Sequence, residues 1–133
     1  MEAKLKHLEM IQGIINRMAS NSFLLKGWSL TLVAALSALS ANNANPLFAL
    51  VALLPCLVFW GLDGFFLRQE RLYRGLYDEV RVKDPKDIDF SMKPSGELGS
   101  WLGVCFSKTL RAFHGVVLVA VLLIVLVFHC TGK

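Results

Sequence analysis

Apolar residues are gathered along this chain in long blocks, whereas a soluble helix or strand would intersperse them with polar residues at a regular period. The longest block, residues 46–67, is almost wholly apolar, and two further blocks cover residues 22–41 and 112–130. As a helix, each block is long enough to cross the roughly 30 Å hydrocarbon core of a bilayer. The pattern predicts an all-α membrane protein with three transmembrane helices, of which the first two form an antiparallel hairpin over residues 22–67.

The charged sequence after the second block continues its helix into water. Residues 68–83 carry an apolar stripe and opposite charges four residues apart, and the helix is expected to end before Pro85, since a residue that precedes proline avoids helical angles. Residues 97–111 predict a second helix that leads into the third span. Joined by the loop at residues 84–96, the two are expected to form an antiparallel cytoplasmic helical stalk over residues 68–111. In this stalk we expect small residues to oppose larger ones: Gly99, Gly103 and Ser107 against Val80, Leu76 and Leu72.

Residues 1–21 predict an N-terminal amphipathic helix that precedes the first span. Its apolar residues recur at steps of three and four: Leu5, Leu8, Ile11, Ile15 and Met18. Such a helix either lies on the membrane surface or docks on neighbouring helices. We favour docking, because its polar face holds too few cations to bind lipid strongly.

Two features shape the predicted hairpin. Ala34 and Ala38 form a pair of small residues four positions apart, which suits close packing between helices in lipid. Pro55 removes a backbone hydrogen bond in the middle of the second span and is expected to kink it. The kink is either a hinge or, more commonly, a fixed bend.

The distribution of charge predicts how the chain is oriented. The net charge is +4, and every lysine or arginine except Lys133 lies in residues 1–26 or 68–111. By the positive-inside rule, the N-terminus and the stalk lie in the cytoplasm and the C-terminus lies on the other side of the membrane. Basic residues of the stalk alternate with acids, which is typical of a solvated or headgroup-facing surface and does not fit a nucleic-acid groove.

Asp63 is the one acid within the apolar blocks. Its helix runs toward the cytoplasm, so its side chain leans toward the membrane interior, where an unpaired charge costs about 1–3 kcal/mol. Lys26, at the same leaflet on the adjacent span, is the predicted partner, and Arg111 is the second choice. Asp63 is an ion or proton site, part of a polar ring in an oligomer, one partner of a structural salt bridge, or a plain interfacial acid.

No set of residues predicts catalysis. The chain lacks the motifs of nucleophilic hydrolases, zinc peptidases, and phosphate- or dinucleotide-binding loops, and its three cysteines include no CxxC pair. Cys56 and Cys105 are expected to be small buried residues. His114 and His129, at the two ends of the third span, are expected to be interfacial residues. We therefore expect a non-enzymatic protein without a metal or other cofactor.

The loop at residues 84–96 is the expected place for a partner. It combines prolines, mixed charge and an apolar pair, and loops carry function more often than the elements that they connect. We expect a cytoplasmic protein or a small signalling ligand to bind there, at Asp87, Ile88, Phe90 and Lys93.

The sequence WGLDGFFLRQERLYRGLYDEVR at residues 60–81, with the N-terminal helix and the hairpin, resembles small bacterial two-transmembrane effector proteins of the SLATT kind. The resemblance covers residues 1–84 and lies in architecture and general character, and the third span is an addition to the two-span plan. It implies a protein of the bacterial inner membrane that forms homo-oligomers and pores in antiphage or nucleotide-signalling systems.

Three functions fit these predictions. The first is a self-associating membrane effector that forms a pore or perturbs the membrane and is gated through its stalk. The second is a non-enzymatic accessory or scaffold subunit whose stalk docks a larger complex. The third, a small oligomeric transporter, ranks last because the spans offer few hydrophilic groups to line a path. We expect the first, with membrane lipid and further copies of the chain as partners.

Overall fold

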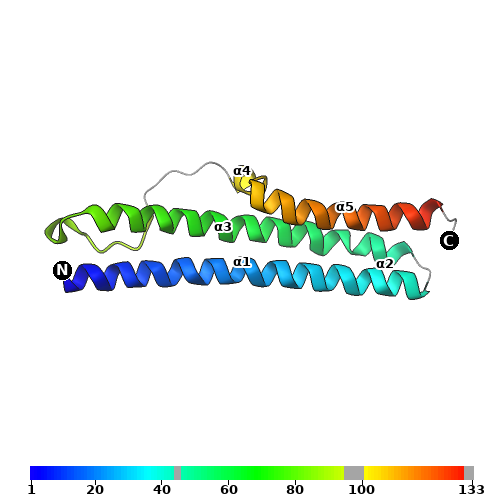
Figure 1. Ribbon diagram of the computed structural model, residues 1–133, viewed down its shortest axis with the longest axis horizontal. Helices are drawn as coiled ribbons and strands as arrows, with labels where there is room; N and C mark the ends of the chain where they lie inside the picture. Colours follow the sequence, from blue (N-terminus) through cyan, green and yellow to red (C-terminus); the bar gives the residue numbers. More distant parts are fainter. Residues whose placement is uncertain (44–45, 95–100, 131–133) are drawn as a thin grey trace.

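The computed structural model describes residues 1–43, 46–94 and 101–130 of an elongated helical bundle (Figure 1). All regular secondary structure in these residues is helical, which confirms the all-α part of the prediction. The elements are, in chain order, α1 (Glu2–Asn43), α2 (Pro46–Val51), α3 (Leu53–Val82), the short 3₁₀ helix η1 (Pro85–Asp87), α4 (Trp101–Cys105) and α5 (Lys108–Cys130).

A single helix, α1, runs the length of the molecule, and α3 lies antiparallel beside it (Figure 1). The predicted boundary between a helix at residues 1–21 and a separate first span is therefore wrong. No proline interrupts the chain there, and α1 keeps packing on α3 across the boundary. Ile15 before it and Ser22 after it are both buried, the first beside Leu76 and the second against Asp63.

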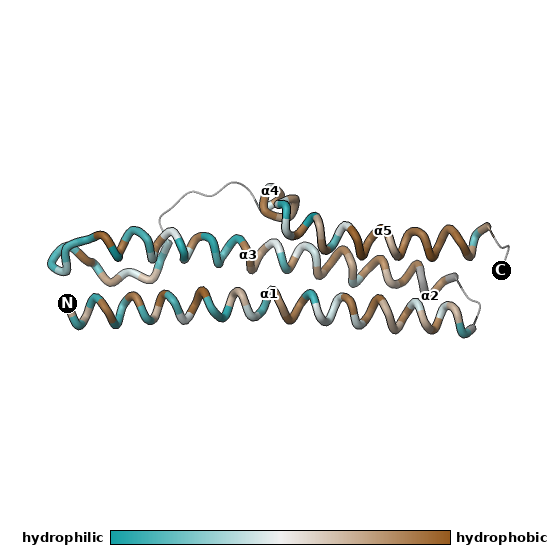
Figure 2. The backbone as a smooth tube through the Cα atoms, viewed as in Figure 1, coloured by the Kyte–Doolittle hydropathy of each residue, from teal (hydrophilic) through white to brown (hydrophobic). Residues whose placement is uncertain are grey.

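Two apolar clusters hold the bundle together. The first cluster joins the start of α1 to the end of α3 and the following loop: Ile11, Ile15, Leu76, Val80 and Ile88. The second cluster joins α1, α3 and α5 around the α2–α3 junction: Val33, Ala52, Cys56, Val117 and Val121. Figure 2 shows that hydrophobic residues dominate the half of the molecule that contains α5, whereas hydrophilic residues are frequent in the other half.

The first cluster shows how the N-terminal part of α1 is used. It docks on α3, as we favoured from the sequence, with Ile11 and Ile15 packed on Leu76 and Val80. The predicted stalk assigned that face of α3 to the segment before the third span. This assignment is wrong, because α1 and the loop residue Ile88 already cover Leu76 and Val80.

Shortening Ile15 to alanine is expected to lower the free energy of unfolding by about 2–5 kcal/mol, because it removes buried carbon atoms and leaves a cavity. The side chain is only 1% exposed. The control is Leu5→Ala on the same helix, where the side chain is 55% exposed and we expect a change of about 0.5 kcal/mol or less. Denaturant unfolding of the purified protein measures both, and equal losses would contradict the docking of this part of α1.

The predicted second span is divided between two helices. α2 ends at Val51 and α3 begins at Leu53, with Ala52 between them in helical backbone conformation. Pro55 lies in the first turn of α3, and because it has no N–H it cannot donate to the carbonyl of Val51, four residues earlier. The interruption therefore lies within one turn of Pro55, where the sequence predicted a kink.

The chain at 97–130 was predicted to be one helix, and this is wrong, because α4 and α5 are separated at Phe106 and Ser107. Ser107, predicted to pack in the stalk, lies in this break, and its buried hydroxyl has no hydrogen-bond partner among the residues that the structure describes. Gly103 lies in α4 and is exposed. Gly99 lies outside the described residues.

α4 packs across α3 at two glycines. The indole N–H of Trp101 donates to the carbonyl of Gly61 at 3.0 Å. A Cβ atom at Gly64 would lie 2.3 Å from Sγ of Cys105, so only glycine allows this approach without a shift. This contact holds α4 about three turns from the face of α3 at Leu76 that the predicted stalk would have used.

Two helices of the described chain are long and apolar enough to cross a membrane, α1 over Glu2–Asn42 and α5 over Lys108–Cys130. In each, only 17% of the most apolar stretch is buried inside the molecule. Ala34 and Ala38, the predicted packing pair, are exposed on α1.

Candidate functional site

Asp63 of α3 has no exposed surface and is bound by side chains from α1 and α5. Lys26 places Nζ 2.6 Å from Oδ2, and His114 places Nε2 2.7 Å from the same oxygen. Ser22 donates its hydroxyl to Oδ1, and its own oxygen accepts from Lys26 Nζ at 2.8 Å. We call these four residues the Asp63 network.

The helices place these side chains by simple geometry. Ser22 and Lys26 are four residues apart and therefore share one face of α1. His114 occupies the buried face of α5, at the same helical period as Leu110, Val117 and Val121. The Asp63 network thus ties the three long helices of the bundle to one carboxylate.

With a neutral imidazole, the charges of the network balance within it. A carboxylate oxygen only accepts hydrogen bonds, so Nε2 of His114 carries the proton that it shares with Asp63. The other ring nitrogen, Nδ1, is buried and has no hydrogen-bond partner in the described chain. A ring with the Nε2 proton alone leaves one negative charge on Asp63 against one positive charge on Lys26. Lys26, with 20% of its side chain exposed, connects this pair with the surface.

Aromatic rings enclose the network. Trp60 stacks on His114, with ring centroids 5.8 Å apart and ring planes 14° apart. Phe113 meets the same imidazole edge-on at 5.1 Å, and its ring centroid lies 6.0 Å from Nζ of Lys26. The indole N–H of Trp60 donates to the carbonyl of Cys105 at 2.7 Å, which connects the network with α4.

This arrangement is suited to holding helices together or to holding a proton. A catalytic acid or base must come within hydrogen-bond distance of its substrate, and Asp63 and His114 have no exposed surface. Within the described residues, no group of three or more histidine, cysteine, aspartate or glutamate side chains is placed to hold a metal ion.

The predicted pairing of Asp63 with Lys26 is present in the structure. Arg111, the second choice, is exposed on α5 and is not among the residues that bind this carboxylate. His114 was predicted to be interfacial, and this is wrong, because it is fully buried beside Asp63. Its position four residues after Leu110, on the apolar face of α5, could have indicated that His114 is buried.

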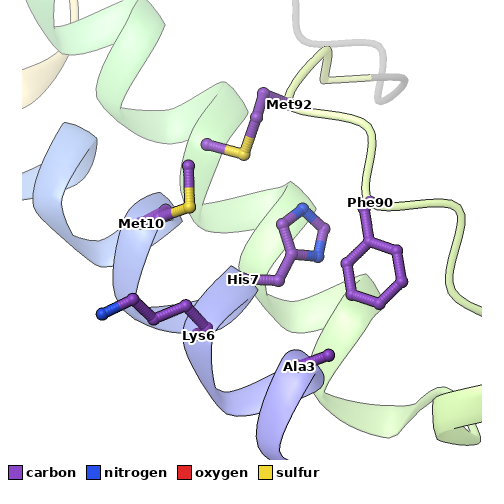
Figure 3. A pocket seen from close by; sticks show the side chains of 6 residues that line it. All are labelled: Ala3, Lys6, His7, Met10, Phe90 and Met92. Atoms are coloured by element: carbon purple, nitrogen blue, oxygen red, sulfur yellow. The ribbon is translucent and has the colours of Figure 1, made fainter.

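A second candidate site lies between the start of α1 and the loop after α3 (Figure 3). His7 is 3% exposed and donates from Nε2 to the carbonyl of Ser91 at 3.1 Å, while its buried Nδ1 has no partner in the described chain. The ring of Phe90 lies 5.4 Å from that of His7, and its backbone φ of 57° is uncommon for a residue other than glycine. The cavity, of about 410 Å³, is lined by Ala3, Lys6, His7, Met10, Phe90 and Met92.

The four loop residues that were predicted to bind a partner lie in different surroundings. Ile88 is buried in the first cluster, where it stabilises the fold. Phe90 lines the cavity beside His7, whereas Lys93 lines a different pocket of about 240 Å³. Asp87 is exposed at the end of η1.

Comparisons with protein families, with curated proteins and with solved structures found no match.

Proposed function

We propose that this chain is a non-enzymatic effector of the bacterial inner membrane that self-associates and forms a pore or perturbs the bilayer when its closed bundle is released. Its three spans are the second half of α1, α2 with the first half of α3, and α5. The N-terminus and the charged end of α3 lie in the cytoplasm, α4 lies at the inner surface of the membrane, and the C-terminus lies on the other side. The positions of lysine and arginine support this orientation, and the exposed apolar surfaces of α1 and α5 support insertion.

One observation carries the proposal: the fully buried Asp63 is held by an ammonium group and an imidazole from two other helices. Ionisable residues in membrane bundles face the interior, pair with one another and mark functional pathways. Separating these helices exposes a carboxylate and an ammonium group that the apolar surroundings cannot solvate. The Asp63 network therefore acts as a latch that keeps the bundle closed until a trigger supplies the free energy to open it.

The cytoplasmic end is connected to this latch through continuous helices. α1 runs unbroken from the first cluster at Ile11 and Ile15 to Ser22 and Lys26. α3 runs from Asp63 to Val80 without a break. A partner or ligand that displaces the start of α1 from α3 consequently moves the groups that hold Asp63, and by this route the cytoplasmic ends of α1 and α3 gate the membrane part.

Self-association uses surfaces that the bundle leaves exposed. Ala34 and Ala38 present small side chains on the outer face of α1, and such pairs allow close approach of helices in lipid. Cysteines placed at Ala38 in two copies should therefore cross-link in membranes. A cysteine at Leu39, which is 43% exposed, is a neighbouring control.

Membrane potential in cells tests the latch. Asp63→Asn keeps the shape of the side chain but removes the charge that holds Lys26 and His114. We expect cells that produce this variant to depolarise at a protein level at which the wild type leaves the potential intact, as read with a potential-sensitive dye. Arg17→Gln, a change at an exposed cation of α1, is the control and should behave like the wild type.

An intact potential with Asp63→Asn and Lys26→Met, both inserted at wild-type levels, would overturn the effector function. The accessory-subunit function would then be the better one, and the cavity beside His7 favours it, because Met10 and Phe90 are about half exposed there. Full-length protein should in that case retain a cytoplasmic partner on purification from membranes, and Phe90→Ser should release it.

A further inference from the structure

A groove of about 370 Å³ lies where α4 crosses α3 and α5. Trp60 and Gly61 of α3 form its floor, Trp101 and Phe106 lie on the α4 side, and Leu118 of α5 closes it. The groove is distinct from the Asp63 network, although Trp60 contacts both: its ring lines the groove and stacks on His114 of the network.

The lining of this groove is almost entirely apolar, and it has almost no polar group free to bind a ligand. The indole N–H of Trp60 is bonded to the carbonyl of Cys105, and that of Trp101 is bonded to the carbonyl of Gly61. A polar ligand would lose its hydration there without gaining hydrogen bonds, which costs free energy. The occupant is therefore apolar where it lies in the groove.

The surroundings of the groove are those of a membrane surface. Leu57, Leu102 and Phe106 are each more than half exposed beside it, and Leu118 belongs to α5, a helix that is long and apolar enough to span a bilayer. Tryptophan is typical of the interfacial region, where its ring lies at the level of the headgroups. An acyl chain from the surrounding leaflet enters this groove without passing through water.

A cation lies above the groove on the same helix face. Arg111 precedes Leu118 by seven residues, which is two helical turns or about 10 Å, so both project from the same side of α5. Helical side chains lean toward the N-terminus, and that direction takes Arg111 away from the acyl region and toward the headgroups. Lys108, one turn earlier, adds a second exposed cation. Guanidinium groups bind phosphate through paired hydrogen bonds.

We propose that this groove is a binding site for one anionic phospholipid, with an acyl chain between Trp60, Trp101 and Leu118 and the phosphate at Arg111 and Lys108. The site rests on the membrane placement and orientation under the proposed function. Because the acyl chain packs on the ring that stacks on His114, bound lipid supports the Asp63 network from outside. The lipid composition of the inner leaflet thereby influences how readily the bundle opens.

Tryptophan quenching by brominated lipid tests this site with the full-length protein in vesicles. Trp28→Phe removes the remaining tryptophan, so that fluorescence reports only Trp60 and Trp101. The vesicles contain phosphatidylcholine with increasing fractions of either brominated phosphatidylglycerol or brominated phosphatidylcholine. We expect half-maximal quenching at an about fivefold lower fraction of the anionic lipid for each cation engaged. Arg111→Gln should reduce this preference several-fold, whereas Arg17→Gln, a change at an exposed arginine of α1, should preserve it.

Two outcomes would overturn the proposal. Equal quenching by both lipids, unchanged by Arg111→Gln, would mean that only the general lipid surround touches these rings. Weak quenching that falls further as the protein-to-lipid ratio rises would mean that a second copy of the chain fills the groove. Quenching needs no ion flux, so a failure of the membrane-potential test leaves this result independent, and the reverse also holds.

Discussion

Replacing Asp63 with alanine is expected to destabilise the protein by about 3–5 kcal/mol, because it leaves Lys26 and His114 without the charge that they surround. Asp63→Asn should cost less, since the amide keeps the volume of the side chain and an oxygen that accepts from Ser22. Denaturant unfolding in a mild detergent, followed by circular dichroism, measures the free energy of unfolding of each variant.

A double-mutant cycle separates the pairing from other effects of these changes. Lys26→Met and Asp63→Asn each leave one charged group without its partner, whereas the double variant leaves neither. The double change should therefore cost clearly less than the sum of the two single changes. Lys6→Met is the matched control: this lysine lies 3.8 Å from Glu9, both side chains are more than 70% exposed, and its loss should change stability by about 1 kcal/mol or less. An additive cycle would contradict the pairing.

The cost of Asp63→Asn also bears on the latch. A variant that remains folded in detergent but depolarises cells has lost the closed state without losing its helices. A variant that unfolds shows only that the Asp63 network is needed for stability. Measuring both properties on the same protein distinguishes these results, because folding is read from helix content and opening from ion movement.

The all-helical class, the end of α3 and the first charge pair could be predicted because they follow from rules that act along the chain. Block length predicted long apolar helices, and the residue before Pro85 predicted the end of α3, which the structure places at Val82. The predicted antiparallel hairpin placed Lys26 and Asp63 at the same level of adjacent helices, and the structure pairs them.

Rules that act along the chain do not show which of two distant segments packs on the same helix face. The end of α3 presents Leu76 and Val80, and both the start of α1 and the segment before α5 offered a complementary face. The hairpin already holds α1 alongside α3. Packing the start of α1 on Leu76 and Val80 therefore fixes the conformation of few additional residues. The segment before α5 follows a loop, whose closure adds an entropic cost. The structure accordingly has α1 on Leu76 and Val80, and α4 farther along α3 at Gly64.

His114 was missed because a single polar residue near the end of an apolar helix fits two environments. At the interface it meets headgroups and water, and in the bundle it needs a buried partner. The two environments are distinguished only by the helix face of His114, which it shares with Leu110 and Val117. That face is informative once it is known to be the inward face of α5. The break at Phe106 and Ser107 was also missed, because no proline in the sequence marks it. In the structure the break occurs together with the packing of α4 on Gly61 and Gly64.

Gly64→Ala is expected to lower the free energy of unfolding by about 1–3 kcal/mol, the range for forcing an extra carbon into a packed site. The new Cβ would lie 2.3 Å from Sγ of Cys105 and 3.5 Å from its Cα, so α4 must move away from α3. The carbonyl of Cys105 accepts the indole N–H of Trp60, and the same movement therefore weakens the stack of Trp60 on His114. Unfolding experiments give the loss, and tryptophan emission reports the altered ring environment.

Gly75→Ala is the matched control, because a Cβ there meets nothing within 4 Å and alanine favours helix by about 0.5–1 kcal/mol. The two substitutions should thus change stability in opposite directions. Adding Cys105→Ala to Gly64→Ala removes the sulfur atom that clashes and should recover most of the loss. If Gly64→Ala proves as harmless as Gly75→Ala, α4 does not pack closely on α3 in solution, and the proposed lipid groove loses the wall that Trp101 supplies.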